Sequence, residues 1–273
     1  MTLRITILGC GSSGGVPRPG MGWGACDPAN PKNRRRRCSV LIERIGHHGT
    51  TRVLVDTGPD LREQLIAASV THLDGVVLTH EHADHTHGID DLRPLVLHMR
   101  RTVDVHADAV TGSVMLERFR YIFETLPGSS YPPIAIRHQI SAGQPFLVTG
   151  EGGAVEILPL SVVHGDIGSL ALKIDNVMYL PDVSGIPNEI TVHFEGLDVW
   201  IIDALRHHPH PAHFSLSQAL AWIERARPRQ AVLTNLHTDL DHAALTAILP
   251  DGVRPAHDGM QINVVRGEIA FGG

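Results

Sequence analysis

Short apolar runs recur along the whole chain, and most of them are too short to form a helix. Apolar runs of about four to eight residues that are bounded by Gly, Pro, Asn or Asp are typical of buried β-strands. Strands are therefore predicted at residues 3–8, 39–43, 52–56, 75–79, 103–107, 155–159, 169–174, 177–180, 199–204, 230–235 and 261–265. These strands fall into two successive groups along the chain.

Helical patterns lie between the predicted strands. Apolar residues at spacings near three and four predict helices at residues 59–68, 87–97, 109–126 and 215–225. Ser215 stands at the start of the last of these and is a suitable N-cap residue. Because each group of strands is followed by helices, the pattern predicts an α/β fold, a four-layer αββα sandwich with two sheets packed face to face. No linker or repeat interrupts it, so residues 1–273 are expected to form a single domain.

Two segments do not fit the strand pattern. Residues 17–38 are rich in Pro, Gly and Arg and are predicted to form a long ordered loop. Residues 108–135 resemble an inserted helical cap. Long loops in compact enzymes are often functional, so both segments are expected either to border a substrate pocket or to decorate the surface.

The composition supports a folded core and gives no sign of a membrane segment. Of 273 residues, 42% are hydrophobic, which is enough for a sizeable core. No apolar run approaches the roughly 18 residues of a membrane span, and the amino terminus lacks the regions of a secretory signal. Three cysteines, Cys10, Cys26 and Cys38, fit a reducing cytoplasm better than a disulfide framework. We expect a cytoplasmic protein with no membrane partner.

The charge balance restricts the class of substrate. The formal net charge is −6 at pH 7, which provides no general attraction for the backbone of a nucleic acid. A large polyanionic partner such as nucleic acid is therefore disfavoured. A small anionic substrate in a locally positive pocket remains compatible with this charge.

The most constrained part of the sequence is Leu-Thr-His-Glu-His-Ala-Asp-His at residues 78–85. His80 and His82 lie two positions apart, so both rings can point to one side of an extended segment. Asp84 and His85 can face the same space after the turn. Imidazole and carboxylate groups in such a set suit zinc, manganese or iron. A His-rich solvated loop is the alternative, but composition alone seldom produces this spacing.

This motif resembles the signature of the metallo-β-lactamase superfamily of metal-dependent hydrolases, and the similarity runs through nearly the whole chain. The opening Ile-Thr-Ile-Leu-Gly-Cys-Gly-Ser-Ser-Gly-Gly-Val-Pro at residues 5–17 resembles the branch of the phosphoribosyl cyclic phosphate phosphodiesterase. The tRNA 3′-processing endonucleases are relatives of that branch. Arg-Cys-Ser at 37–39 and Asp-Gly-Met at 258–260 support the same branch. The superfamily implies the αββα sandwich that the strand pattern predicts.

The resemblance implies a site for two divalent metal ions. The implied ligands are His80, His82 and His164 for one ion and Asp84, His85 and His237 for the other, with Asp182 between them. A carboxylate suits the bridging position because each of its oxygens can reach one cation. Some relatives have histidine where Asn235 stands, which leaves the last ligand open between His237 and Asn235. We expect His237 to bind the metal and Asn235 to hydrogen-bond behind it.

Three further residues are expected to support the chemistry. Asp56, which resembles the superfamily aspartate after the second strand, is expected to orient a ligand imidazole, and Thr79 to help. For Asp56, a turn-forming role is the alternative. Relatives have a histidine at the position of His213, which is our candidate for the general acid. The neighbouring histidines are interpreted mostly as solvated loop residues: His207, His208 and His210.

Four consecutive arginines at residues 34–37 are candidates for binding a phosphate, because guanidinium groups bind phosphate bidentately. Alternate residues of a strand face opposite sides, so at most two can reach a substrate, and Arg35 and Arg37 are expected to do so. A solvated charged surface is the alternative. The glycines between residues 9 and 15 are interpreted as a turn that lets the backbone approach the metal pocket.

One departure from the branch concerns a structural zinc. The phosphonate-pathway relatives carry a cysteine cluster after Gly-Val-Pro, but here Met21 and Trp23 occupy the matching positions and only Cys26 remains. One cysteine cannot build a closed four-ligand site. No structural zinc is therefore expected, and the exact substrate of those relatives does not transfer.

Taken together, the residues and the resemblance predict a dinuclear metal-dependent phosphodiesterase that acts on a small cyclic or nucleotide-like phosphate ester. Two cations about 3.5–4 Å apart would lower the pKa of a shared water, so a bridging hydroxide would be the nucleophile. Zinc is the expected metal, and manganese is compatible with the carboxylates. The alternatives are a tRNA 3′-processing endonuclease, a lactone, thioester or lactam hydrolase, and a non-catalytic metal-binding protein. The oligomeric state is open, and a homodimer is compatible with the sequence.

Overall fold

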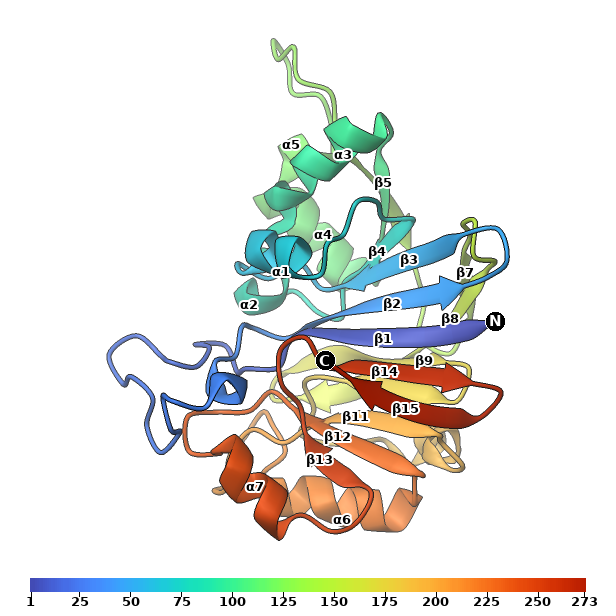
Figure 1. Ribbon diagram of the computed structural model, residues 1–273. Helices are drawn as coiled ribbons and strands as arrows, with labels where there is room; N and C mark the ends of the chain where they lie inside the picture. Colours follow the sequence, from blue (N-terminus) through green and yellow to red (C-terminus); the bar gives the residue numbers. More distant parts are fainter.

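Two mixed β-sheets form the centre of the molecule (Figure 1). The computed structural model describes residues 1–273. The first sheet has the order β15-β14-β1-β2-β3-β4-β5-β6. Its strands are β1 (Thr2–Gly9), β2 (Ser39–Ile45), β3 (Thr50–Val55), β4 (Gly75–Val77), β5 (Val103–Ala107), β6 (Ala135–Gln139), β14 (Gln261–Val265) and β15 (Glu268–Gly272). Pairing is antiparallel from β15 to β3 and parallel from β3 to β6.

The second sheet has the order β13-β12-β11-β10-β9-β8-β7. Its strands are β7 (Phe146–Val148), β8 (Val155–His164), β9 (Ile167–Ile174), β10 (Val177–Leu180), β11 (Val199–Asp203), β12 (Gln230–Thr234) and β13 (Val253–Pro255). The strands β10 to β13 run parallel, whereas β7 to β10 pair antiparallel. Each sheet therefore contains a parallel half, and the carboxyl ends of parallel strands meet at one edge.

Helices cover the outer face of each sheet (Figure 1). The first sheet carries α1 (Leu61–Ala67), α2 (Ala83–Thr86), α3 (Arg93–Met99), α4 (Ala109–Arg118), α5 (Arg120–Phe123) and the 3₁₀ turn η2 (Ile89–Leu92). The second carries α6 (Leu216–Ala226), α7 (His242–Ile248) and η3 (Asn188–Phe194), and η1 (Pro31–Asn33) lies in the long loop after β1. No helix has the length and apolar character that crossing a bilayer requires. The four layers confirm the predicted αββα sandwich.

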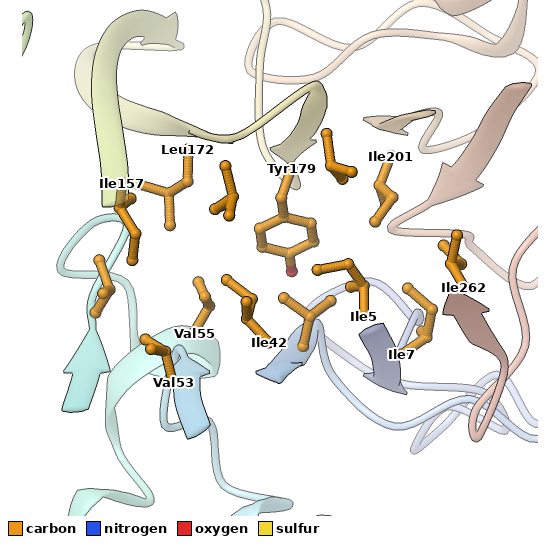
Figure 2. Packing of buried hydrophobic residues seen from close by; sticks show 14 of the residues in the cluster. Ile5, Ile7, Ile42, Val53, Val55, Ile157, Leu172, Tyr179, Ile201 and Ile262 are labelled. Carbon is orange, nitrogen blue, oxygen red and sulfur yellow. The ribbon is translucent and has the colours of Figure 1, made fainter. Parts of the chain in front are cut away.

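The central strands are buried on both faces over most of their length, which explains the apolar runs in their sequences. Ile5, Ile42 and Val55 of the first sheet point toward Leu172 and Ile201 of the second, as Figure 2 shows. Alternate residues of the same strands, Leu8, Leu41 and Leu54, face the other way and pack against the helices of the first sheet. The strand period of two thus divides the apolar residues between two core layers.

The strands that the apolar pattern does not predict are the edges of the sheets. They are β15 and β6 in the first sheet and β13 and β7 in the second. In β6, for example, four of the five residues are exposed. Edge strands are short and have one uncovered side, so they lack the continuous apolar run that identifies a central strand. All the predicted strands are present; β5, β10 and β14 have the predicted ends, and the ends of the others are shifted.

Two helical predictions change in detail. The helix expected at 87–97 begins as η2 and becomes α-helical only from Arg93, and the one expected at 109–126 breaks at Phe119. At the start of α6, Ser215 is the N-cap and forms a capping box with Gln218, as expected.

The segment 108–135 is not an inserted cap. Its helices α4 and α5 lie between β5 and β6, which pair in parallel, and a parallel connection needs such a crossover. Both helices pack on the sheet that they connect. Only the connection from residue 124 to 134 extends away from the sheet, at the top of Figure 1.

The loop at residues 17–38 is ordered by contacts with the segment around α7. Asn33 is fully buried; its amide donates to Asp241 Oδ2 at 2.6 Å, and its carbonyl oxygen accepts from the His242 amide at 2.8 Å. The Arg35 guanidinium donates to the Leu240 carbonyl at 2.7 Å. These contacts hold the loop beside the carboxyl end of β12.

Candidate active site

Polar residues gather where the strands of both sheets end. Asp56 follows β3, His80 comes shortly after β4, and Asp182 shortly after β10. Asp203 is the last residue of β11, and His164 is the last residue of β8. The parallel halves of both sheets deliver the four aspartate and histidine side chains that end or follow β3, β4, β10 and β11 to one edge of the sandwich, which is where ligands bind in open α/β sheets. His164 reaches the same edge from β8, in the antiparallel half of the second sheet.

Three overlapping clusters of potential metal ligands occupy this edge. They consist of His80, His82 and His164; of His80, His85 and Asp182; and of His164, Asp182 and His213, each with ligand atoms within 4.8 Å of one another. Because the clusters share members, they form one continuous site. Imidazole and carboxylate groups in this number suit divalent transition metals such as zinc.

The donor atoms fit a metal ion. His80 is 1% exposed and its Nδ1 lies 3.0 Å from Thr79 Oγ1, but its Nε2 has no hydrogen-bond partner. Buried polar atoms without a partner are rare and point to a missing ion or water. Burial holds the pKa of His80 well below its usual range, so the imidazole is neutral, which is the form that binds metals.

Buried partners fix the orientation of two other imidazoles. Asp56 accepts hydrogen bonds from the Thr79 amide at 2.8 Å and from His85 Nδ1 at 2.7 Å. His164 Nδ1 lies 2.6 Å from the Ala212 carbonyl, to which it donates. With Nδ1 engaged in both rings, Nε2 is left for the cluster, the arrangement common in zinc sites.

Two carboxylates that line the cavity over the clusters, Asp182 and Asp84, are ionised although both are largely buried. Burial raises the pKa of Asp182, but His85, whose Nε2 lies 2.9 Å from Asp182 Oδ2, together with nearby imidazoles lowers it well below its usual range. Burial also raises the pKa of Asp84, and His85 outweighs this and lowers it to about 2. Buried negative charge requires compensating cations, so the electrostatics agree with the donor set.

His213 is held by a second buried carboxylate. Its Nδ1 lies 2.9 Å from Asp203 Oδ2 and 3.4 Å from Asp182 Oδ1. Burial lowers the pKa of His213, but the hydrogen bond and charge of Asp203 outweigh it and raise the pKa to about 9. Burial raises the pKa of Asp203 to about 7. The carboxylate of Asp203 therefore favours the protonated form of His213, which is itself a member of the third cluster.

Asn235 connects the carboxylates of Asp182 and Asp203 and does not belong to a ligand cluster. Its Nδ2 lies 3.1 Å from Asp182 Oδ1 and 3.2 Å from Asp203 Oδ1. His237 lies outside the three clusters, and its Nδ1 is 3.4 Å from Asp239 Oδ1. It lines the cavity that lies over the clusters. Burial, followed by the charge of Arg18, lowers the pKa of His237. The assignment of His237 as the last ligand stays a prediction.

The arginine run does not reach this cavity. Arg35 is 2% exposed and its Nη1 and Nη2 donate to the carbonyls of His237 and Leu240, so its role is structural instead of the expected contact with substrate. Arg37 Nη2 lies 2.9 Å from Asp60 Oδ1. Both line a neighbouring cavity that excludes the histidine clusters. Residue type alone suggested phosphate binding, but main-chain carbonyls and a carboxylate occupy these guanidinium groups.

The cavity over the clusters has a volume of about 280 Å³. Besides cluster members it is lined by Ser12, Ser13, Asp84, Arg18, Leu205, Arg206, His210, Ala212 and His237. Sequence reasoning missed Arg18, Arg206 and Asp203. Of these three residues, only Asp203 could have been predicted from the sequence, because it ends an apolar strand much as Asp182 follows one. His210 lines the cavity, whereas His207 and His208 do not.

Comparison with known proteins agrees with this fold and site. Residues 51–235 match the model of the β-lactamase superfamily domain. The chain is 32% identical over 264 residues to an octanoyltransferase of Porphyromonas gingivalis, covering 95% of this chain and 51% of that protein. It is 30% identical over 149 residues to a ribonuclease Z of Bradyrhizobium sp., covering 52% and 45%. The chain spans about half the length of the curated relatives it matches.

Solved structures extend the comparison to the whole chain. A diphosphatase of the PhnP family superposes with a TM-score of 0.86 at 32% identity, covering 96% of this chain and 97% of that one. The zinc-bound PqqB of Methylobacterium extorquens has a TM-score of 0.71 at 16% identity, covering 94% and 99%, and shares the fold. These matches confirm the resemblance that the sequence motifs carry, and the chain belongs to the metallo-β-lactamase-fold proteins of the β-lactamase superfamily.

Proposed function

We propose that this protein is a metal-dependent phosphodiesterase that hydrolyses a small cyclic or nucleotide-like phosphate ester. The observation that carries the proposal is the pair His213–Asp203, in which Asp203 lies outside the ligand clusters and hydrogen-bonds to a histidine of the third cluster. Hydrolysis of a phosphodiester releases an alkoxide, which is a poor leaving group unless it is protonated. A histidine that a buried carboxylate keeps protonated supplies that proton.

Two divalent ions would be held by the cluster residues and their neighbours, with zinc as the first choice and manganese as the second. The residues are His80, His82 and His164 for one ion, Asp84, His85 and His237 for the other, and Asp182 between them. When bound, such ions activate water as a nucleophile and offset the charge of the attacked phosphate.

The remaining chemistry belongs to the chain itself. Asp203 accepts from His213 Nδ1 at 2.9 Å, so the proton on Nε2 is the one that can pass to the leaving oxygen. Asn235 donates to both Asp182 and Asp203 and holds the acid in place relative to the ligand set. Asp56 fixes His85, and the Ala212 carbonyl fixes His164. The site is thus organised before substrate binds, which reduces the cost of reorganisation.

The size of the cavity favours a small substrate. Ligand pockets commonly measure about 300–1,000 Å³, and this one, at about 280 Å³, is at the lower limit. Together with the net charge of −6, this argues against the tRNA precursor that ribonuclease Z relatives suggest.

Hydrolysis of a diphosphate is the second candidate. It is favoured by the 32% identity over nearly the whole chain to the diphosphatase of the PhnP family. The two reactions differ in the leaving group, since a phosphate needs less help from an acid than an alkoxide does. Dependence on His213 therefore separates them.

The test is turnover of purified, metal-analysed protein on a panel of esters. The panel contains bis-p-nitrophenyl phosphate, cyclic phosphoribose, cyclic nucleotides, a dinucleoside diphosphate and a tRNA precursor. Asp182→Ala is the inactive variant, and Asp251→Ala, an exposed aspartate, is the matched control. We expect about two metals per chain and cleavage of small diesters that only Asp182→Ala abolishes. Metal-loaded protein that cleaves no phosphate ester of the panel would refute the proposal, and lactones, thioesters and lactams would then be assayed.

A further inference from the structure

His237 lines the cavity over the ligand clusters but lies outside all three of them. It stands in the turn between β12 and α7, residues 235–241, whereas His164 is the last residue of a strand. The position of the His237 imidazole therefore depends on the contacts that this turn makes.

Two side chains of the turn contact the ring of His237. Thr238 Oγ1 lies 3.2 Å from His237 Nδ1, and Asp239 Oδ1 lies 3.4 Å from the same atom. Asp239 Oδ2 accepts from the His207 amide at 3.1 Å, which fixes the carboxylate against the connection between β11 and α6. With Nδ1 facing a hydroxyl and a carboxylate, Nε2 is the ring nitrogen left to bind a metal ion.

One oxygen of Asp239 lacks a hydrogen-bond donor. Oδ1 is shielded from solvent and has no hydrogen-bond partner at the observed separation, and the only ion pair of Asp239 is with His237. A buried acceptor without a donor costs free energy, and an approach of the imidazole to about 2.9 Å would satisfy it. The Nδ1 proton also becomes more acidic when Nε2 binds a cation, which strengthens a hydrogen bond to a carboxylate.

The main chain of His237 is fixed from both sides. Its amide donates to the Leu205 carbonyl at 2.9 Å. Its carbonyl accepts from Arg35 Nη1 at 3.2 Å, and Arg35 Nη2 donates to the Leu240 carbonyl at 2.7 Å. Arg35 is 2% exposed, and all of its hydrogen-bond acceptors are neutral. A buried charge is costly unless it is hydrogen-bonded, so the loss of either contact is unfavourable and the turn is held against the loop at residues 17–38.

The two proposed metal sites differ in how firmly their ligands are oriented. The three histidines proposed for the first ion already form a cluster, and His164 among them donates to the Ala212 carbonyl at 2.6 Å. Asp239 lies further from the imidazole of His237, and its side chain is 33% exposed. The ion that depends on His237 should therefore be the more weakly held of the two.

We propose that Asp239 is a positioning residue that orients His237 toward the second metal ion, on a turn that Arg35 holds in place. This inference rests on the ligand set of the proposed function and adds the residues on which its last ligand depends. Asp239 contacts the ring of His237 and acts through it.

The experiment is a competition for zinc between the metal-loaded protein and a chelator, followed by metal analysis. Wild type should lose its two ions in two steps. Asp239→Asn should weaken the binding of the more labile ion about 10- to 100-fold and leave the tighter ion unchanged. The reason is that an amide has one acceptor oxygen for two donors, His237 Nδ1 and the His207 amide. Asp251→Asn, at an exposed position, removes the same charge elsewhere and should leave both steps unchanged.

A double-mutant cycle separates positioning from a general loss of structure. His237→Ala removes the ligand and should weaken the same ion. Asp239→Asn should then cause no further loss of affinity, because no ring remains to be oriented. Arg35→Lys should lower the free energy of unfolding in both backgrounds, but it should weaken the labile ion only where His237 is present.

Three results would overturn the proposal. They are an Asp239→Asn variant that binds both ions as tightly as wild type, an equal loss of affinity on Asp239→Asn with and without His237, and a wild type that holds a single ion. In each case the protein could still cleave a phosphate ester, and the proposed function would stand. Conversely, a protein that cleaves no phosphate ester refutes the proposed function, while the chelator competition still decides the role of Asp239.

Discussion

Replacement of Asp203 by asparagine tests the assignment of the acid most directly. The amide has the same shape and its oxygen can still accept from His213 Nδ1, now 2.9 Å from Asp203 Oδ2, so the ring keeps its place. What disappears is the buried negative charge, together with the oxygen that accepts from Asn235 Nδ2 at 3.2 Å. Asp203 is outside the three ligand clusters, so metal content should not change.

The magnitude follows from the pKa of His213. The surroundings, with Asp203 as the main raising influence against the lowering effect of burial, move this pKa from 6.5 to about 9, which is worth roughly 3 kcal/mol in favour of the imidazolium. A general acid works while it is protonated, so activity persists at neutral pH and falls as pH rises through the pKa of His213. Loss of the Asp203 charge lowers that pKa. The alkaline fall in kcat/KM should therefore move to lower pH, and kcat at pH 8 should drop by about 10²- to 10³-fold.

The assay is the pH dependence of kcat/KM on a small diester that has an unactivated alkoxide leaving group. Asp251→Asn, at an exposed site, is the control, and metal content and thermal unfolding are measured for both variants. An Asp203→Asn enzyme with full metal content and an unchanged alkaline limb would refute the assignment of His213 as an acid that Asp203 supports. A shift of the alkaline fall in kcat/KM on a diester, with little change in kcat/KM on a diphosphate, would show how much each leaving group depends on the acid.

Three other substitutions test separate parts of the structure. Asp56→Asn should weaken metal binding about 10- to 100-fold, because the carboxylate that accepts from His85 Nδ1 is lost. Asparagine tolerates the backbone φ of 65° at this position. Unchanged metal affinity in a chelator competition would contradict the role of Asp56 in orienting His85. Tyr179→Phe should stabilise the protein by about 1 kcal/mol in urea denaturation, because the tyrosine hydroxyl is buried between the sheets without a partner (Figure 2); a loss of similar size would mean that the hydroxyl is satisfied. Ser215→Ala should lower the free energy of unfolding by about 1 kcal/mol, because the capping box is lost. The control is Ser113→Ala, at an exposed position of α4, which should leave the free energy of unfolding unchanged. Equal effects of the two substitutions would argue against the cap.

The central strands and the first part of the candidate metal site could be predicted from the sequence because their signals are local. A strand buried on both faces must be continuously apolar, as in β4 and β10. The residues from His80 to His85 lie within one turn, so their spacing along the chain already implies proximity in space. The N-cap at Ser215 is equally local, since it depends on residues of the first helical turn.

The edge strands and the partners of the acid were decided only by tertiary structure. Strand β6 is largely exposed and therefore has no apolar signal. Asn235 meets Asp182 and Asp203 because β10, β11 and β12 are parallel neighbours whose carboxyl ends lie at one edge. His213 meets Asp203 because the connection from β11 to α6 returns to the end of β11. Nothing in the spacing of these residues along the chain requires that meeting.

The arginines also show the difference between what the sequence predicts and what the tertiary structure decides. Residue type made Arg35 a candidate to bind phosphate, but the folded chain places its guanidinium against the carbonyls of His237 and Leu240. Arg18, which drew no notice in the sequence, reaches the cavity because Gly14 leaves room for its side chain. The sequence by itself determined which chemistry is available, since side-chain type sets which groups can bind a metal or an anion. The tertiary structure decided which of those groups share a cavity and which are already paired, because that depends on contacts between segments far apart in the chain.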